Sequence, residues 1–381
     1  MRTTLSADPA GIVWPDTADG DTARRWLSPM LRDGTDAFVA NAKVEMQVLT
    51  VGAGADAVAL PVTLSRPDPD LAYPASPVQH YVAYAAEEAR KVSRGADLAA
   101  RATLRPLAAL LRRTAFDRAV MVNNYLLSTN LWPAMMAEHV GAAVGALRAA
   151  FPDRALAFKS LDPVSAPAVL DACRDLGAVL VPSRVVWTLD PAGAALDRIK
   201  NVRRDARLLA RTPYRVRRGE TLSPAEVARA GALYRMLYLG KYVRLNPDLT
   251  DRFLAHAIGE GLLTVRAFER GGRIDAALGY FVRGGVMTQP VFGYDTALPP
   301  SLGLYRLLAA QVLVEARAQG VPVLNRSAGA GRFKKLRGGE PQTEVHAVFC
   351  GHLPQRQRAV WHALRAVADG LAFPMIRRLE L

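Results

Sequence analysis

The stretch from Leu324 to Gly339, LNRSAGAGRFKKLRGG, carries the strongest structural signal in the chain. The apolar run 321–324 before it predicts a strand, and the small residues 327–331 predict a turn into the basic segment 332–337. A small-residue turn between a strand and a basic helix exposes backbone N–H groups beside fixed positive charge, which suits a phosphate-bearing ligand. The alternative is a glycine-permitted turn that leads into a solvated basic helix.

Length and charge set the class of protein. The chain has 381 residues, enough for two domains of ordinary size, and half of the residues are hydrophobic. The formal net charge of +14 favours polyanionic partners: nucleic acid, an anionic membrane surface or a phosphate-rich cosubstrate. The charge does not choose among them, and a high arginine content can also reflect genomic composition.

Several classes of protein are disfavoured by what the sequence lacks. Cys173 and Cys350 are far apart and form neither a disulfide framework nor a zinc pattern, and no cluster of metal ligands is present, so we expect no metal site. The first residues lack the apolar core of a signal peptide, and no run of about 18 apolar residues predicts a membrane span. We therefore expect a cytoplasmic protein, for which peripheral contact with a membrane through basic surface stays open.

The first half of the chain predicts a hairpin followed by alternating helices and strands. Residues 43–51 and 57–65 alternate as two paired strands. Helical periodicity covers 82–113. The other predicted elements are strands at 119–127, 155–158, 178–181 and 184–189 and helices at 23–32, 133–151 and 166–176.

The segment from Arg198 to Arg218 is strongly basic, with Asp205 as its single acid. Five cationic residues fall at helical i, i+3 and i+4 intervals and predict one basic face: Lys200, Arg203, Arg204, Arg207 and Arg211. Such a face points either to solvent or to an anion. We expect residues 198–220 to be a basic helical linker between an N-terminal domain, 1–197, and a C-terminal domain, 221–381.

A second series of elements starts at Ser223. Ser223, Pro224 and Glu226 predict a helix start with an N-cap, a first-turn proline and a capping box. Glycine pairs at 271–272 and 284–285 predict tight turns in an antiparallel meander. The predicted helices are 224–239, 249–259, 301–319 and 355–372, and the predicted strands are 262–269, 274–283, 286–292, 321–325 and 343–349.

This order of elements, over residues 223–350, resembles an N-acyltransferase domain of the GNAT superfamily. The basic segment 198–211, the FGYD segment 292–295 and the segment SAGAGRFKKLRGG are similar more specifically to the Fem-type branch, in which two GNAT-like domains are fused. The resemblance implies an α/β (α+β) fold with a mixed sheet in tandem GNAT-like domains, the second better defined than the first.

The resemblance also implies where a donor binds. In the GNAT fold the strand before the central helix splays from the next strand, the acyl-thioester lies in that gap, and its pyrophosphate sits at the helix N-terminus. The corresponding segment here is 293–305, GYDTALPPSLGLY, which keeps only Ser301 and Gly303 of the usual glycine-rich loop and lacks its basic residue. We expect no permanently bound cofactor, and acyl-CoA or another acyl-thioester as cosubstrate.

Three functions follow from the resemblance. The leading one is transfer of an acyl group from acyl-CoA or acyl-carrier protein to a small-molecule amine by direct attack. Fem-type transfer of an aminoacyl group from charged tRNA is the alternative; the net charge and the basic linker favour it. The absence of the long coiled-coil insertion of many Fem-type enzymes speaks against it. The third is a non-catalytic binding module that kept the fold and lost the donor loop.

Candidate acid–base residues lie on two strands. Tyr294 is placed to protonate a leaving group, and Asp295 either acts as a base or ends its strand. Glu344 and His346 share one strand face, where they accept the amine proton or serve a structural role. The candidates for binding the donor are Ser301, Gly303, Tyr305, Asn325, Ser327, Lys334 and Lys335.

Overall fold

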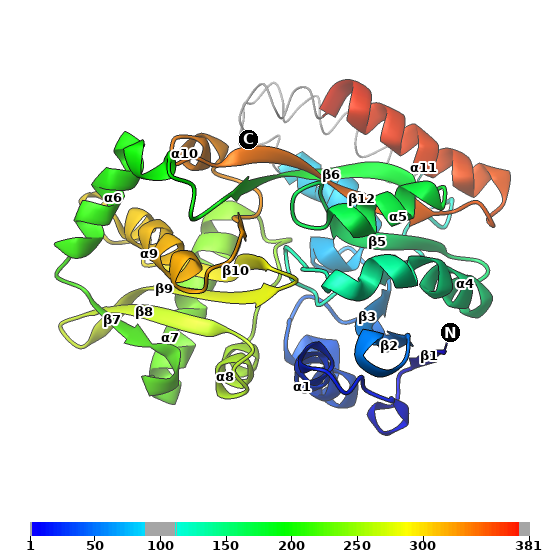
Figure 1. Ribbon diagram of the computed structural model, residues 1–381, viewed down its shortest axis with the longest axis horizontal. Coiled ribbons are helices and arrows are strands. Elements are labelled where there is room, and N and C mark those ends of the chain that lie inside the picture. The colour runs from blue at the N-terminus through cyan, green and yellow to red at the C-terminus, as the bar shows by residue number, and fades with distance from the viewer. Residues whose placement is uncertain (1, 88–110, 112, 373–381) are drawn as a thin grey trace. The chain divides into compact units, whose positions relative to one another are not determined.

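The computed structural model describes residues 2–87, 111 and 113–372 (Figure 1). The chain forms a mixed α/β fold whose described residues divide into two compact units. The first unit contains the residues up to Arg184, then 243–248 and those from Thr343 onward; the second contains Val185–Tyr242 and Leu249–Gln342. The first unit is therefore assembled from segments distant in sequence.

The first unit is built on strands in the order β1-β2-β3-β4-β5-β12-β6. The predicted hairpin is confirmed, because β2 and β3 pair antiparallel, and β4 and β5 pair parallel. The strands are β1 (Thr3–Ser6), β2 (Glu45–Val51), β3 (Val58–Leu64), β4 (Ala119–Val122), β5 (Ala155–Leu161), β6 (Val179–Leu189) and β12 (Glu340–Phe349). The helices are α1 (Ala18–Asp33), α4 (Val140–Ala150), α5 (Pro167–Asp175) and α11 (Gln355–Val367).

Both faces of this sheet are buried. Val120 and Val122 of β4 belong to a core with α4 and α5, whereas the alternate residues Ala119 and Met121 pack with α11 through Trp361. This alternation follows from the two-residue period of a strand. Each cysteine lies in one of these cores, where burial raises the pKa of its thiol. Neither thiol is therefore activated as a nucleophile.

The second unit has the strand order β6-β11-β10-β9-β8-β7. The antiparallel meander predicted from the glycine pairs is confirmed by the pairing of β8 with β9 and of β9 with β10. The strands are β7 (Arg215–Arg218), β8 (Thr264–Arg270), β9 (Arg273–Arg283), β10 (Val286–Tyr294) and β11 (Val323–Asn325). The helices are α6 (Lys200–Ala210), α7 (Pro224–Arg235), α8 (Asp251–Gly259), α9 (Leu304–Ala318) and α10 (Gly331–Lys335).

Helix α9 is the central helix of the second unit. Its Leu307, Leu308 and Val312 are almost fully buried in a core with β8, β9, β10 and β11. Helix α7 begins with the predicted capping box of Ser223 and Glu226. It lies so close to β10 that a Cβ on Gly293 would stand 2.6 Å from the backbone oxygen of Leu233.

Several predicted boundaries were wrong. The strand 119–127 ends at Val122, because Asn123 and Leu126 adopt positive φ angles. The strands 178–181 and 184–189 form one strand, β6; Pro182 removes a donor, but its φ is compatible with extended backbone. The segment 198–220 is only partly helical, since it contains β7. The helix 133–151 starts with a 3₁₀ turn, Ala134–His139. Most of the predicted helix 82–113 lies outside the described residues.

Candidate active site

Strands β10 and β11 separate within the second unit. They pair parallel over only three residues, from Val286 opposite Val323 to Thr288 opposite Asn325. Beyond that point β11 ends, β10 continues to Tyr294, and the register of β10 against β9 shifts between Thr288 and Val291. Residues 289–294 therefore have no β11 partner, as the resemblance to the GNAT fold implied.

Aromatic side chains gather where the two strands have parted. The ring of Tyr305, in the first turn of α9, lies 6.2 Å from that of Tyr294, 5.1 Å from that of Phe292 and 4.7 Å from that of Phe333. Burial raises the pKa of Tyr305, so its phenol stays protonated at neutral pH. Tyr294 accepts a hydrogen bond of 3.0 Å from the ammonium group of Lys241. The structure thus brings the two predicted tyrosines together.

The carboxylate of Asp295 forms two ion pairs. It binds the guanidinium groups of Arg229 and Arg273 and accepts a hydrogen bond from the backbone N–H of Ala297. Burial alone would raise the pKa of Asp295, but these three donors outweigh it and hold the pKa below its usual value. A carboxylate held in this way is a weak base, so its contacts fit the structural interpretation better than the catalytic one.

The entry to α9 carries the two predicted loop residues. Ser301 lies in a 3₁₀ turn, Pro300–Leu302, and Gly303 is the N-cap residue with φ of +64°. No side chain caps the helix, so no side-chain oxygen accepts from its first N–H groups. A Cβ on Gly303 would stand 2.8 Å from Leu208, which places α6 directly against this helix end.

Lys334 and Asn325 shape the turn between β11 and α10. The buried ammonium group of Lys334 donates to the carbonyl oxygens of Arg326, Ser327 and Ala328 at 2.6 to 2.9 Å. The side-chain oxygen of Asn325 accepts from the backbone N–H of Ser327, at 2.9 Å. These contacts hold the turn, in which Ser327 and Ala330 have positive φ angles. Lys335, in contrast, is exposed.

The single acid of the basic segment points inward. Asp205 of α6 is only 3% exposed, and its two carboxylate oxygens bind Arg306 of α9 and Arg337 after α10. The predicted cationic residues of this segment are all exposed, and among the described residues none of them has an ion pair: Lys200, Arg203, Arg204, Arg207 and Arg211. We call these five the α6 cationic face. Helix α6 is thus fixed to α9 on one side and presents unpaired charge on the other.

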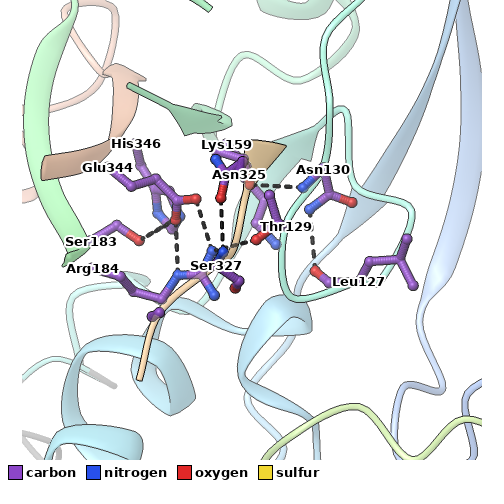
Figure 2. A network of polar contacts seen from close by, with 12 residues as sticks. Leu127, Thr129, Asn130, Lys159, Ser183, Arg184, Asn325, Ser327, Glu344 and His346 are labelled. Atoms are coloured by element: carbon purple, nitrogen blue, oxygen red, sulfur yellow. Dashed lines mark hydrogen bonds and ion pairs between the residues drawn. The ribbon is translucent and has the colours of Figure 1, made fainter. Parts of the chain in front are cut away.

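Glu344 and His346 lie in the first unit, within a buried polar network (Figure 2). Glu344 binds the guanidinium group of Arg184 through both carboxylate oxygens. The hydroxyl of Ser183 lies 3.2 Å from Glu344 and 2.9 Å from Nε2 of His80. The two predicted residues therefore share a network, but their polar groups already have partners inside it.

The protonation of this network follows from its burial. Burial lowers the pKa of His80 and His346 well below the usual value, and it raises the pKa of Tyr81, whose hydroxyl lies 2.9 Å from Nδ1 of His346. Both histidines are therefore neutral at pH 7. Burial, reinforced by Arg184, lowers the pKa of Lys159 to about 7.

Lys159 has neutral partners. Its ammonium group donates to the backbone oxygen of Pro74, at 2.7 Å, and to Oδ1 of Asn124, at 2.9 Å. Proximity in sequence favours an ion pair with Asp162, but Asp162 accepts from the backbone N–H groups of Val164 and Ser165 instead. Lys159 is therefore a buried cation without a carboxylate among the described residues.

Comparison with known proteins tests the resemblance. The family model described as an acetyltransferase (GNAT) domain matches residues 197–335. Those residues form a GNAT-type acyltransferase domain. All of its strands and helices, from α6 to α10, lie in the second unit described above. This match supports acyl transfer as the chemistry of the domain.

Solved structures extend the likeness beyond the GNAT domain. The crystal structure of FemX is 8% identical, covers 96% of this chain and 100% of its own, and has a TM-score of 0.51, which shows a shared fold. The C-terminal domain of a putative lysylphosphatidylglycerol synthetase from Agrobacterium fabrum is 14% identical, with a TM-score of 0.42. It covers 66% of this chain and 82% of its own. L-PGS from Bacillus licheniformis is 12% identical, with a TM-score of 0.43, and covers 65% of this chain and 83% of its own. No curated protein matches the sequence.

Two further properties of the described residues bear on the site. None of their helices combines the length and the apolar character that a membrane crossing requires. No group of three or more His, Cys, Asp or Glu side chains among them could hold a metal ion.

The predicted site residues thus fall into two groups. Nine of them lie in the GNAT domain, namely Tyr294, Asp295, Ser301, Gly303, Tyr305, Asn325, Ser327, Lys334 and Lys335, and two lie in the first unit, Glu344 and His346. Two residues of these contacts were not predicted from the sequence: Lys241, which contacts Tyr294, and Arg184, which binds Glu344. The signal for Arg184 was its charge in the strand VLVPSRVVWTL, which has no other charged residue.

Proposed function

We propose that this chain transfers an acyl group from an acyl-thioester, acyl-CoA or acyl-carrier protein, to a small-molecule amine. The observation that carries the proposal is the early end of the β10–β11 pairing, with Tyr294 and Tyr305 at the parted end. An extended donor arm can pair with the free edge of β10, as a strand would. The uncapped N-terminus of α9 is then available for the donor's phosphates.

The reaction needs few groups from the protein. The amine nitrogen attacks the thioester carbonyl carbon, the C–N bond forms, the C–S bond breaks, and the sulfur leaves as a thiolate that takes up a proton. The phenol of Tyr294 supplies that proton. The ammonium group of Lys241, 3.0 Å away, stabilises the phenolate that remains.

The proton of the attacking amine goes to solvent in this proposal. Asp295 is held by Arg229 and Arg273, and so is not assigned as the base. Glu344 and His346 are assigned a structural role in the first unit, because their polar groups are already bonded there.

A second candidate is aminoacyl transfer from charged tRNA, and the α6 cationic face favours it. From Lys200 to Arg211 this face extends about 16 Å at the rise of an α-helix. A row of unpaired cations of that length suits a nucleic acid backbone better than the few phosphates of coenzyme A. The fold shared with FemX is consistent with the Fem-type alternative.

Ligand-induced thermal stabilisation separates the two donors. A ligand that binds only the folded state raises the unfolding temperature by mass action. We expect acyl-CoA to raise the Tm of the purified protein with little dependence on salt. A shift produced only by aminoacyl-tRNA, and lost at high salt, would replace the thioester with tRNA. No shift with acyl-CoA, acyl-carrier protein or tRNA would favour a non-catalytic binding module.

A further inference from the structure

The second unit contains a cavity whose wall includes neither Tyr294 nor Tyr305. Its volume is about 150 Å³, and it lies among α6, α9, β11 and the end of β6. The residues that α9 contributes, 309–317, lie one turn or more beyond Tyr305. Most of the wall is aliphatic, including Leu189, Val202, Leu209, Ala310, Leu313 and Leu324. In another protein, an apolar cavity of about this size binds one benzene molecule.

A buried cation on the wall of this cavity, Arg326, lacks an anion. Arg326 is 6% exposed, and its guanidinium group has no hydrogen bond or ion pair with any residue that the structure describes. The guanidinium carbon of Arg326 lies 5.9 Å from the centre of the Phe333 ring. Burial lowers the pKa of Arg326 to about 10, so the group remains charged at neutral pH. An unpaired buried charge is costly, and a bound anion would remove that cost.

The other charged groups of the wall do not supply an anion for Arg326. Asp205 has both carboxylate oxygens bound to Arg306 and Arg337. Asp197 forms an ion pair of 2.9 Å with Arg317. The wall thus carries two acids and four arginines, namely Arg203, Arg317, Arg326 and Arg337. The site attracts an anion and repels an amine.

We propose that this cavity binds a small monocarboxylate whose apolar body has about six carbon atoms. The carboxylate would bind the guanidinium group of Arg326, and the body would lie against the aliphatic wall. A carboxylate with an apolar body fits this lining better than inorganic phosphate, which has no apolar part to bury. A neutral alcohol of the same size would leave Arg326 unpaired. This ligand is distinct from the acyl donor proposed above.

Titration calorimetry of the full chain with matched ligands tests the proposal. Hexanoate and benzoate are the probes, with 1-hexanol and inorganic phosphate as controls for the apolar body and for the charge. We expect both carboxylates to bind at least ten-fold more tightly than either control. Equal binding of phosphate, or no binding of either carboxylate, would overturn the proposal.

Two variants locate the site. Arg326→Gln removes the cation, and Ala310→Leu fills the cavity while it retains Arg326; each should weaken benzoate binding at least ten-fold. Arg215→Gln, an exposed arginine of β7 outside the cavity, is the matched control and should bind like the wild type. Unchanged binding in Ala310→Leu, with circular dichroism confirming its fold, would place the ligand elsewhere and overturn the assignment.

Discussion

Arg184 binds both carboxylate oxygens of Glu344 inside the first unit. The distances are 2.9 Å from Nε to Oε1 and 2.8 Å from Nη2 to Oε2. The two side chains are only 10% and 2% exposed. Further donors of Arg184 reach the hydroxyl groups of Tyr73 and Thr129. Each charge is tolerated there because the other is present.

Replacement of Glu344 by Gln should therefore be strongly destabilising. The change leaves Arg184 buried without its carboxylate, and we expect a loss of about 3–5 kcal/mol in the free energy of unfolding. Urea denaturation measures it. The double variant Arg184→Met, Glu344→Leu is the control and should lose less than Glu344→Gln alone. A loss below about 1 kcal/mol in Glu344→Gln would contradict a buried, mutually dependent pair.

Lys159 should make stability depend on pH. Its pKa is about 7 in the folded chain, against 10.5 for an exposed lysine. Between these values the unfolded chain holds a proton that the folded chain has released, so the free energy of unfolding rises with pH. The slope for one proton is about 1.4 kcal/mol per pH unit. The Lys159→Met variant lacks this contribution.

Urea denaturation of both proteins from pH 7 to 10 checks this. The free energy of unfolding of the wild type, minus that of Lys159→Met, should increase across that range. A difference that stays constant would show that Lys159 titrates alike in the folded and unfolded chains. The absolute stability of Lys159→Met does not enter the test, since its uncharged side chain also loses the hydrogen bonds to Asn124 and Pro74.

Gly293 should not tolerate a side chain. A Cβ there would stand 2.4 Å from the backbone nitrogen of Tyr234 in α7, and backbone atoms cannot move aside cheaply. We expect Gly293→Ala to lower the free energy of unfolding by about 3 kcal/mol. At Gly145 in α4 a Cβ would have no atom within 4 Å, so Gly145→Ala should raise it by about 0.5–1 kcal/mol. Equal effects of the two changes would refute the close approach of α7 to β10.

Tyr294→Phe should reduce turnover with an acyl-CoA and its amine by at least about 100-fold, because the leaving thiolate loses its proton donor. Lys241→Met should cause a smaller loss, since it removes only the stabilisation of the phenolate. Release of free thiol measures both. Tyr242→Phe, an exposed neighbour of Lys241, is the matched control. Wild-type turnover in Tyr294→Phe would remove this residue from the mechanism.

The features that the sequence predicted well depend on neighbouring residues. The capping box at Ser223 and Glu226 joins residues three apart, and the glycine pairs bound the strands of the meander directly. Local chemistry alone specifies such features. The antiparallel strands β8, β9 and β10 were therefore predicted close to their observed bounds.

The features that the sequence did not predict join distant residues. Arg184 and Glu344 are 160 positions apart, and Asp205 meets Arg306 across 101 positions. Periodicity identified the cationic residues of α6 but could not show that Asp205 turns inward onto α9. Likewise, Lys334 matched a donor-binding position in sequence, yet its ammonium group is bound by three backbone oxygens of its own turn. Only the folded chain shows these partners.

Photocrosslinking tests the proposed donor site most directly. An acyl-CoA with a diazirine in its acyl chain would be irradiated on the wild-type protein and the adducts mapped by mass spectrometry, with unlabelled acyl-CoA as competitor. We predict competed adducts within residues 289–305, on the free part of β10 and the entry to α9. Adducts confined to other segments, or labelling that acyl-CoA does not compete, would contradict an acyl-thioester donor at the parted strands.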